Sequence, residues 1–361
     1  MQRARVWGCA TAVAAHLCVA CGSSDEATSP ASQGSVTTDT GTGYTGTGGG
    51  HGTSTHSDSG GSGGAELLGP PYPVVLAHGF FGFEKFAGQD FATYFYELKD
   101  HLAQVSGEEV YTPAVDPFND SAFRGAQLVE AIEAIVAETG HGKVNIIGHS
   151  QGGLDARWVA HERPDLVASV VTIATPHGGT PVADIVLKLI ADPAFESILD
   201  ELTKAIGAPL YDQVGDETSV TKPLHLFSEE GIAEFNATVT DRPGVLYASI
   251  AGRSDMHEGG SPCAPDVEQP FIAAAAAERD PIDPLLAVTE SILDGGLFQS
   301  LPNDGLVRVE HGKHGEFWGC IPADHLDEVG QLFGDGPGLG NDWDYKKFYV
   351  DLVAALRARG L

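Results

Sequence analysis

The chain has 361 residues and carries 50 acidic against 20 basic side chains, which gives a formal net charge of −30 at pH 7. This excess of acid argues against binding to nucleic acid and against electrostatic attachment to an anionic membrane, so any contact with lipid must be hydrophobic. The length fits one α/β domain once the first 64 residues, which look unfit to fold, are set aside.

The first 21 residues have the features of an export signal. Arg3 and Arg5 precede an apolar stretch, Val6 to Ala20, which is too short to span a bilayer. The sequence LCVAC resembles the cleavage box of bacterial lipoproteins, in which Cys21 would be acylated. We expect residues 1–21 to be a signal peptide, and the mature protein to be either a cell-envelope lipoprotein or a secreted extracellular protein.

Residues 22–64 are dominated by Gly, Ser and Thr. Such a segment has too little apolar surface to offset the entropy of ordering, so we expect a disordered, flexible tether. His51 and His56 lie in this tract and are interpreted as solvated histidines without a metal role. The folded domain then spans residues 65–361.

The five cysteines divide into two groups when the signal is removed. Cys9 and Cys18 leave with the signal, and Cys21 would carry the lipid. Cys263 and Cys320 remain, and two thiols in an exported chain predict one disulfide.

Strand-like and helix-like patterns alternate from residue 72 onward. This βαβ alternation predicts a mostly parallel sheet with helices on both faces, whose functional loops lie at the carboxyl ends of the strands. The predicted elements are strands 74–77, 109–113, 143–147, 167–174 and 246–251, and helices 91–105, 123–139 and 154–161.

In the segment VNIIGHSQGG, residues 144–153, an apolar strand is followed by a Gly-x-Ser-x-Gly turn that contains Ser150. This pattern is typical of a nucleophile elbow. A serine hydroxyl is a weak nucleophile, so it needs a neighbouring imidazole and hydrogen-bond donors for the developing oxyanion. The sequence therefore predicts a serine nucleophile at this turn.

In the upstream segment PYPVVLAHGFFGF, an apolar strand is followed by a glycine-containing loop. Such a loop after an early strand fits one side of an oxyanion hole. We expect the main-chain N–H of Phe80 to act together with that of Gln151, the residue after the nucleophile. The Phe pair, Phe80 and Phe81, also suits an apolar substrate.

The acid and the base should follow the nucleophile in the order acid, then base. Asp255 follows a predicted late strand, and Asp304 lies in the turn PNDGLV, so both are candidates for the acid. His325, which opens HLDEVGQLF, is the favoured base. The other histidines that remain open as the base are His257, His311 and His314.

The segments YPVVLAHGFFGF, VNIIGHSQGG, TPHGG, NDGLV and HLDEVGQLFG resemble, in this order, the secreted bacterial true lipases. The resemblance covers roughly residues 70–361 and implies an α/β-hydrolase fold, whose folding in this family typically depends on a dedicated foldase. It implies Ser150 as nucleophile, Asp304 as acid and His325 as base. It also places the two oxyanion donors on Phe80 and Gln151.

The same resemblance implies a structural calcium ion that steadies the loop bearing the base. Its carboxylate ligands correspond here to Asp280 and Asp327, with a side-chain oxygen from Gln331 and the main-chain carbonyl of Asp335. Such oxygen ligands suit calcium. Asp283 and Asp294 lie in the same region as Asp280 and stay open as alternatives to it.

The family also uses the segment corresponding to about residues 180–225 as a mobile helical lid. Here this segment carries apolar residues at helical spacing, which suits either a lid that opens at a lipid surface or a fixed helical cover. The apolar residues are Leu187, Ile190, Phe195, Ile198, Leu199, Leu202 and Ile206. We expect His177, in the TPHGG turn, to be structural.

We predict an exported serine carboxylic ester hydrolase, a monomer that acts as a triacylglycerol lipase on lipid esters at an oil–water interface. Two alternatives within catalysis are a short-chain esterase and a polyester depolymerase, which would share the triad and differ in the lid and the acyl groove. An alternative from another class is a noncatalytic surface binding protein that keeps the hydrolase fold.

Overall fold

A computed structural model of the chain describes part of its length. The described residues are 67–80, 94–189, 218–219, 221–254, 260–295, 299–331, 334, 336–337 and 341–361. They fall within residues 64–361, which form one structural unit. The predicted signal, the tether and Cys21 lie outside the described residues.

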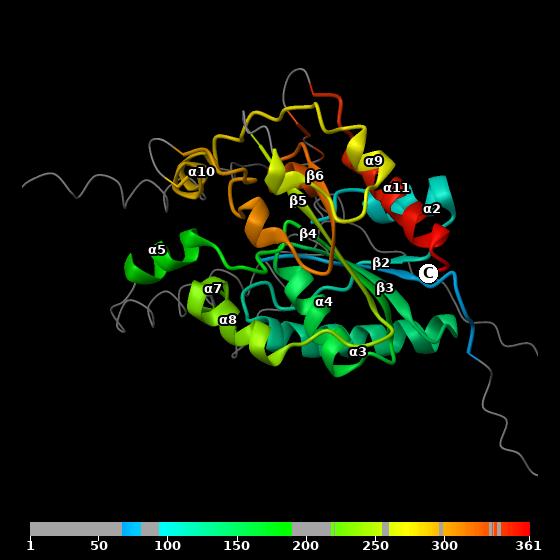
Figure 1. Cartoon of the computed structure of the whole chain (residues 1–361). Helices are drawn as coiled ribbons and strands as arrows, with labels where there is room; N and C mark the ends of the chain where they lie inside the picture. Colours follow the sequence, from blue (N-terminus) through cyan, green and yellow to red (C-terminus); the bar gives the residue numbers. More distant parts are fainter. Residues whose placement is uncertain are drawn as a thin grey trace, which may run out of the picture. The chain divides into compact units, whose positions relative to one another are not determined.

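Six strands in the described part of the chain form one sheet in the order β2-β1-β3-β4-β5-β6, and every neighbouring pair is parallel (Figure 1). The predicted α/β class with a mostly parallel sheet is therefore confirmed. The strands are β1 (Val74–Ala77), β2 (Val110–Tyr111), β3 (Val144–His149), β4 (Val167–Ile173), β5 (Leu246–Gly252) and β6 (Glu316–Ile321).

Helices cover both faces of the sheet. Helices α2, α9 and α11 lie on one side of it, and α3, α4 and α8 lie on the other (Figure 1). The helices are α2 (Leu98–Ser106), α3 (Ser121–Thr139), α4 (Gln151–Glu162), α5 (Pro181–Leu189), α7 (Thr221–Phe227), α8 (Glu229–Thr238), α9 (Pro270–Ala273), α10 (Ala287–Leu293) and α11 (Tyr345–Ala358). Single 3₁₀ turns are η1 (Ser261–Cys263), η2 (Val309–Gly312) and η3 (Asp327–Val329).

The side chains of β1 show how the two faces form separate cores. Val74 and Leu76 pack with α2 and α11, whereas Val75 and Ala77 pack with α3 and α4. All four are buried, because a strand in the middle of a parallel sheet is covered on both faces. This explains why the strand reads as an unbroken apolar run rather than an alternating one.

The carboxyl ends of the strands lie level with one another at the same end of the sheet. The parallel register pairs Ala77 with Gly148 and Gly252 with Ile321, so the loops after β1, β3, β5 and β6 leave the sheet side by side. Loops at the carboxyl ends of parallel strands are where such folds assemble their sites. The predicted nucleophile, acid, base and oxyanion loop all follow one of these strands.

Two elements differ clearly from the sequence prediction. The helix expected at 91–105 begins at Leu98, because Glu97 has a left-handed backbone (φ 54°) that a right-handed helix cannot include. Strand β6 was not predicted. The candidate lid lies mostly outside the described residues, which include only residues 180–189, 218–219 and 221–225 from that segment. Among the described helices, none has the length and apolar character needed to cross a bilayer.

Cys263 and Cys320 form a disulfide that joins η1 to β6. The bond closes a loop with a sequence separation of 57. Because β6 leads directly into the loop that carries His325, the disulfide ties that loop's supporting strand to the preceding segment of the chain.

Replacing both cysteines by serine should lower the free energy of unfolding by ~4 kcal/mol, because the unfolded chain regains the freedom that a closed loop of this length removes. Urea unfolding followed by circular dichroism measures the change. Reduced wild-type protein is the control and should match the double variant. Equal unfolding midpoints for the oxidised protein and the variant would contradict this role.

Candidate active site

Ser150 lies in the sharp turn between β3 and α4. Its backbone has φ 55° and ψ −130°, a left-handed conformation that costs a non-glycine residue free energy and persists only where the surroundings enforce it. Here the Ser150 N–H donates to the Ile173 carbonyl at 2.9 Å, and the Thr175 hydroxyl donates to the Ser150 carbonyl at 2.8 Å. The turn therefore has the geometry of a nucleophile elbow.

Helix α4 packs directly on the end of β1. A Cβ atom at Gly152 would lie 2.0 Å from the Ala77 carbonyl oxygen, so only glycine permits this approach. The approach brings the N-terminus of α4, with the Gln151 N–H, next to the loop that carries Phe80. The Gln151 side chain points away into the interior, where its amide donates to the Asn119 carbonyl at 2.7 Å.

The structure brings His325 and Asp304 together. The His325 Nδ1 lies 3.0 Å from Asp304 Oδ2, and both side chains are buried. The other carboxylate oxygen of Asp304 accepts the N–H groups of Leu306 at 2.8 Å and Val307 at 2.6 Å. Asp304 is thus fixed in place and holds the imidazole with Nε2 available for chemistry.

The alternatives for the acid and the base do not assemble in this way. His311 Nδ1 lies 3.0 Å from the Gly179 carbonyl oxygen, and His314 Nε2 lies 2.8 Å from Asp241 Oδ1. Neither is paired with Asp304. Asp255 and His257 lie outside the described residues.

Phe80 is the last described residue of the loop that follows β1. Its ring makes edge-to-face contacts with Phe118 and with Phe227 of α7, at centroid distances of 6.0 and 6.3 Å. The residue therefore combines a main-chain N–H near the elbow with an apolar side chain packed towards α7. An ester with an apolar acyl group would suit such surroundings.

The sequence of this chain is similar to those of known proteins. A model of the α/β-hydrolase fold family matches residues 72–202. A triacylglycerol lipase of Vibrio cholerae is 35% identical over 268 residues, which cover 73% of this chain and 81% of the relative. A triacylglycerol lipase of Pseudarthrobacter phenanthrenivorans is 44% identical over 291 residues, covering 73% of this chain and 90% of the relative.

The chain belongs to the bacterial triacylglycerol lipases of the α/β-hydrolase fold. The resemblance inferred from the motifs is thereby confirmed, and the protein is a serine ester hydrolase. Among solved structures, the lipase of Staphylococcus hyicus has a TM-score of 0.58 at 19% identity, with 81% of this chain and 98% of that chain covered. This likeness supports the fold.

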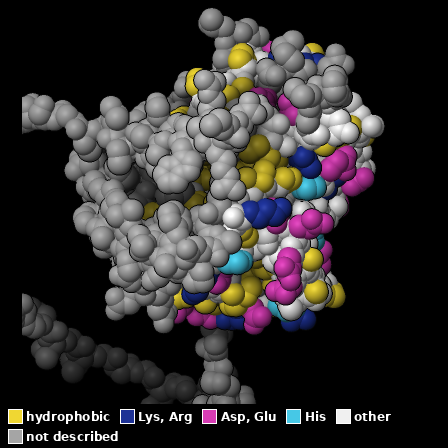
Figure 2. Space-filling view, turned by 90° about the vertical axis from the view of Figure 1, so that its left-hand side faces the viewer, with side chains coloured by type: hydrophobic (Ala, Val, Ile, Leu, Met, Phe, Trp, Pro, Cys, Tyr) yellow, Lys and Arg dark blue, Asp and Glu magenta, His cyan; other side chains and the backbone are white. Residues whose placement is uncertain are grey.

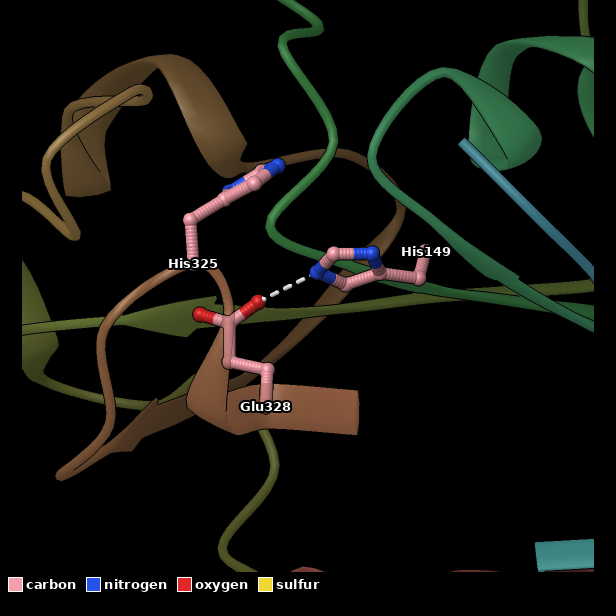
Figure 3. A group of neighbouring side chains, drawn as sticks. All are labelled: His149, His325 and Glu328. Carbon is pink, nitrogen blue, oxygen red and sulfur yellow. Dashed lines mark hydrogen bonds and ion pairs between the residues drawn. The ribbon is translucent and has the colours of Figure 1, made fainter. Parts of the chain in front are cut away.

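A buried polar chain of side chains includes His149, the residue before Ser150, and lies beside His325. The Tyr94 hydroxyl lies 2.6 Å from His149 Nδ1, and His149 Nε2 lies 2.8 Å from Glu328 Oε2. Figure 3 shows His149 and Glu328 joined by this bond beside His325, whose ring centroid is 4.6 Å from that of His149. Neither Glu328 nor His149 was predicted from the sequence to be a site residue.

The protonation of this chain follows from burial. Burial raises the pKa of Tyr94 above its ordinary value, so the phenol keeps its proton and donates to His149. Burial, and then the charge of His325, lowers the pKa of His149 well below its ordinary value. A neutral His149 then donates from Nε2 to Glu328. His149, His325 and Glu328 offer donor atoms within 4.8 Å of one another, but His149 Nε2 and Glu328 Oε2 already bond each other, so we assign no metal there.

Three carboxylates gather beside the His325 loop. One oxygen from each of Asp280, Asp324 and Asp327 lies within 4.8 Å of the others, and all three side chains are buried. Asp324 accepts the N–H groups of Leu326 and Asp327 at 2.9 and 3.1 Å, so the cluster is built into the loop. Burial raises the pKa of Asp324 above its ordinary value. Close carboxylates with oxygen donors fit a divalent cation such as calcium.

The carboxylate cluster includes two of the residues that were predicted to bind calcium. Asp280 and Asp327 belong to the cluster, and Asp324, which sequence analysis missed, is its third member. Gln331, four residues after Asp327, stays a prediction, and Asp335 lies outside the described residues. The one feature of the sequence that could have indicated Asp324 is its position directly before His325.

The two alternatives to Asp280 do not contribute carboxylates to the cluster. The main-chain N–H of Asp283 donates to Asp324 Oδ2 at 2.9 Å. The Asp294 carboxylate instead lies 3.3 Å from the amide nitrogen of Asn303. The geometry therefore favours Asp280 over both.

His177 is held in a buried network between β4 and α4. Arg157 donates to its Nδ1 at 3.1 Å, so Nε2 carries the hydrogen and faces the Thr172 hydroxyl at 2.9 Å. Burial, and then the Arg157 charge, lowers the pKa of His177 well below its ordinary value. These contacts support the structural role expected for this residue.

A His177→Gln variant should lose less stability than wild type when the pH falls from 7 to 5. The native state keeps His177 neutral while the unfolded chain takes up a proton below pH ~6.5, so acid favours unfolding by about 1.4 kcal/mol per pH unit for this one group. Urea unfolding at both pH values measures the two decreases. Parallel decreases in both proteins would contradict the assignment.

Proposed function

We propose that this enzyme hydrolyses the ester bonds of triacylglycerols through an acyl-serine intermediate formed on Ser150. The observation that carries the proposal is the strained elbow at Ser150 together with the buried His325–Asp304 pair. Membership of a family whose characterised relatives are triacylglycerol lipases supports the substrate class.

In the proposed mechanism, His325 Nε2 takes the proton of Ser150 as its hydroxyl oxygen attacks the ester carbonyl. Asp304 accepts a hydrogen bond from Nδ1, which fixes the tautomer and stabilises the imidazolium that forms. His325 then returns the proton to the departing alcohol. A water molecule activated by the same imidazole attacks the acyl-serine and releases the fatty acid.

The negative charge that develops on the carbonyl oxygen requires donors in fixed positions. We propose the main-chain N–H groups of Phe80 and Gln151 for this role. Gln151 is the first residue of α4, so the partial positive charge of a helix N-terminus adds to its donor. Removing one such donor from a serine hydrolase typically costs about 10²- to 10³-fold in turnover.

Apolar surface near the candidate lid supports contact with lipid. Ile185 of α5 and Val288 of α10 are 38% and 65% exposed, and the two helices contact each other. Figure 2 views the side of the molecule that bears α5 and α10, and its described part shows hydrophobic side chains among charged ones. We propose that residues 180–225 act as a lid that opens at an oil–water interface.

We propose that Asp280, Asp324 and Asp327 hold a structural calcium ion, with Gln331 and Asp335 as further ligands. The ion would neutralise three buried carboxylates and hold the loop that carries His325, and it would take no part in the reaction. The oxygen-only donor set of the cluster supports calcium over softer metals.

The predictions of export, of a lipid anchor on Cys21 and of a foldase requirement remain proposals, as does the monomeric state. The N-terminal sequence supports export and the lipid anchor, and the resemblance to foldase-dependent lipases supports the foldase requirement.

Ser150→Ala should abolish hydrolysis of a soluble chromogenic ester, because no other group in the proposed mechanism can form the acyl intermediate. An organophosphonate should label wild type at one site per chain and leave the variant unlabelled. Circular dichroism and thermal unfolding provide the folding control. Near wild-type activity in a folded Ser150→Ala protein would refute the proposal.

The hydrolysis rate of a sparingly soluble triglyceride should rise steeply once its concentration passes the solubility limit. The physical reason is that an emulsion offers an interface at which a lid can open. The Ser150→Ala variant serves as the control that measures background hydrolysis. Saturation below the solubility limit, without a further rise, would instead favour the short-chain esterase with a fixed helical cover.

Chelation of calcium should lower the thermal midpoint of wild type, and added calcium should restore it. Binding to the native state alone stabilises by about 2.7 kcal/mol at a hundredfold excess over Kd. Asp324→Asn should respond only at higher calcium concentrations. Asp100→Asn, which makes the same charge change at an exposed position of α2, is the matched control. An Asp324→Asn curve that superimposes on wild type would argue against the site.

A further inference from the structure

Two buried side chains, Arg124 and His78, hold the peptide group between Gly79 and Phe80 from the interior of the protein. Arg124 of α3 is fully buried, and its Nη2 donates to the carbonyl oxygens of His78 at 2.6 Å and Gly79 at 3.3 Å. Its Nη1 donates to the Asp116 carbonyl at 2.8 Å. One guanidinium therefore satisfies three carbonyls of irregular, buried backbone, which a helix or strand cannot satisfy there.

The second side chain is His78, whose tautomer is fixed by its partners. The main-chain N–H of Val115 donates to His78 Nε2 at 3.1 Å, so the ring hydrogen lies on Nδ1. Nδ1 in turn donates to the Gly79 carbonyl oxygen at 2.9 Å. Burial lowers the pKa of His78 to about 3, so the ring keeps this neutral tautomer. The Gly79 carbonyl thus accepts from both His78 and Arg124.

Fixing this carbonyl also fixes the N–H on the other side of the same peptide. In a planar trans peptide the C=O and the N–H point in opposite directions. A Gly79 carbonyl turned into the interior towards Arg124 therefore turns the Phe80 N–H outward. Gly79 itself lies against the elbow, because a Cβ atom there would be 2.6 Å from Ser150 Cβ and 3.1 Å from Ser150 Oγ.

The same arginine is tied to the helix that provides the other donor. Arg124 Nε donates to Asp155 Oδ2 at 2.8 Å, and both groups are buried. Asp155 lies four residues after Gln151 in α4, on the same face of the helix. Arg124 therefore joins the loop of the Phe80 N–H to the helix of the Gln151 N–H.

We propose that Arg124 and His78 are positioning residues of the oxyanion hole, which orient the Phe80 N–H and set its separation from the Gln151 N–H. The inference rests on the proposed function, because it assumes that these N–H groups serve the oxyanion. Neither side chain touches the substrate, so both act on catalysis through the Gly79 peptide. Loss of either should affect the transition state more than substrate binding.

Arg124→Lys is the principal test, because an ammonium keeps the charge but cannot make four bonds in the planar arrangement of a guanidinium. His78→Phe removes the second donor to Gly79 while retaining a ring. Arg157→Lys is the matched control: Arg157 is a buried arginine of α4 whose nitrogens bond His177, Asn236 and the Val239 carbonyl, away from the loop.

Three readouts separate positioning from general stability. Organophosphonate titration counts active sites, kcat and KM are measured for a soluble ester, and Ki is measured for an alkyl boronic acid, which forms a tetrahedral adduct with the nucleophile. For Arg124→Lys we expect kcat per active site to fall by about 10²-fold, with KM changed by less than about threefold. The boronate Ki should rise in parallel with the loss of kcat/KM, and Arg157→Lys should keep kcat within about threefold of wild type.

The inference is overturned if Arg124→Lys keeps kcat within about threefold, if Arg157→Lys shows the same loss, or if the loss lies in KM alone. If Arg124→Lys does not fold, His78→Phe is judged by the same criteria. Ser150→Ala is measured in parallel. Its inactivity, combined with an unchanged Arg124→Lys, would overturn only this inference, whereas an active Ser150→Ala would overturn the proposed function.

Discussion

The left-handed backbone at Ser150 is the constraint on which the rest of the site depends. A non-glycine residue pays about 1–3 kcal/mol for such a conformation, so it must be enforced by its surroundings. Parallel register brings the ends of β1, β3 and β4 together, and the Ile173 carbonyl and the Thr175 hydroxyl fix the turn. The same packing brings α4 onto β1. The strain at one residue and the proximity of the two proposed oxyanion donors therefore have a common structural cause.

Compensation of buried negative charge organises the other half of the site. Asp304 is satisfied by His325 and by two main-chain N–H groups. Glu328 is held by a neutral His149, and burial together with nearby carboxylates raises its pKa well above its ordinary value. Next to it lies the acidic cluster that contains Asp324, and a bound cation would neutralise the charge of its carboxylates. A metal that never meets the substrate would in this way govern the position of the base.

The sequence predicted the features that depend on local patterns. Apolar strands and the glycine-rich turn around Ser150 have strict local requirements, and both were found where they were expected. Glu328 could not be predicted, because an acid in HLDEV looks like an exposed helical residue until packing buries it. Arg124 could not be recognised because its role depends on carbonyls some 45 residues away in the chain. Strand β6 was not predicted because Gly319, which has φ 120°, interrupts its apolar pattern.

A crystal structure of the enzyme with a phosphonate bound covalently tests the central claim most directly, because the phosphoryl oxygen occupies the place of the oxyanion. The account predicts phosphorus bonded to Ser150 Oγ, with that oxygen about 2.7–3.1 Å from the main-chain nitrogens of both Phe80 and Gln151. His325 Nε2 should face Ser150 Oγ. Attachment to another residue, or a phosphoryl oxygen that contacts neither nitrogen, would contradict the account.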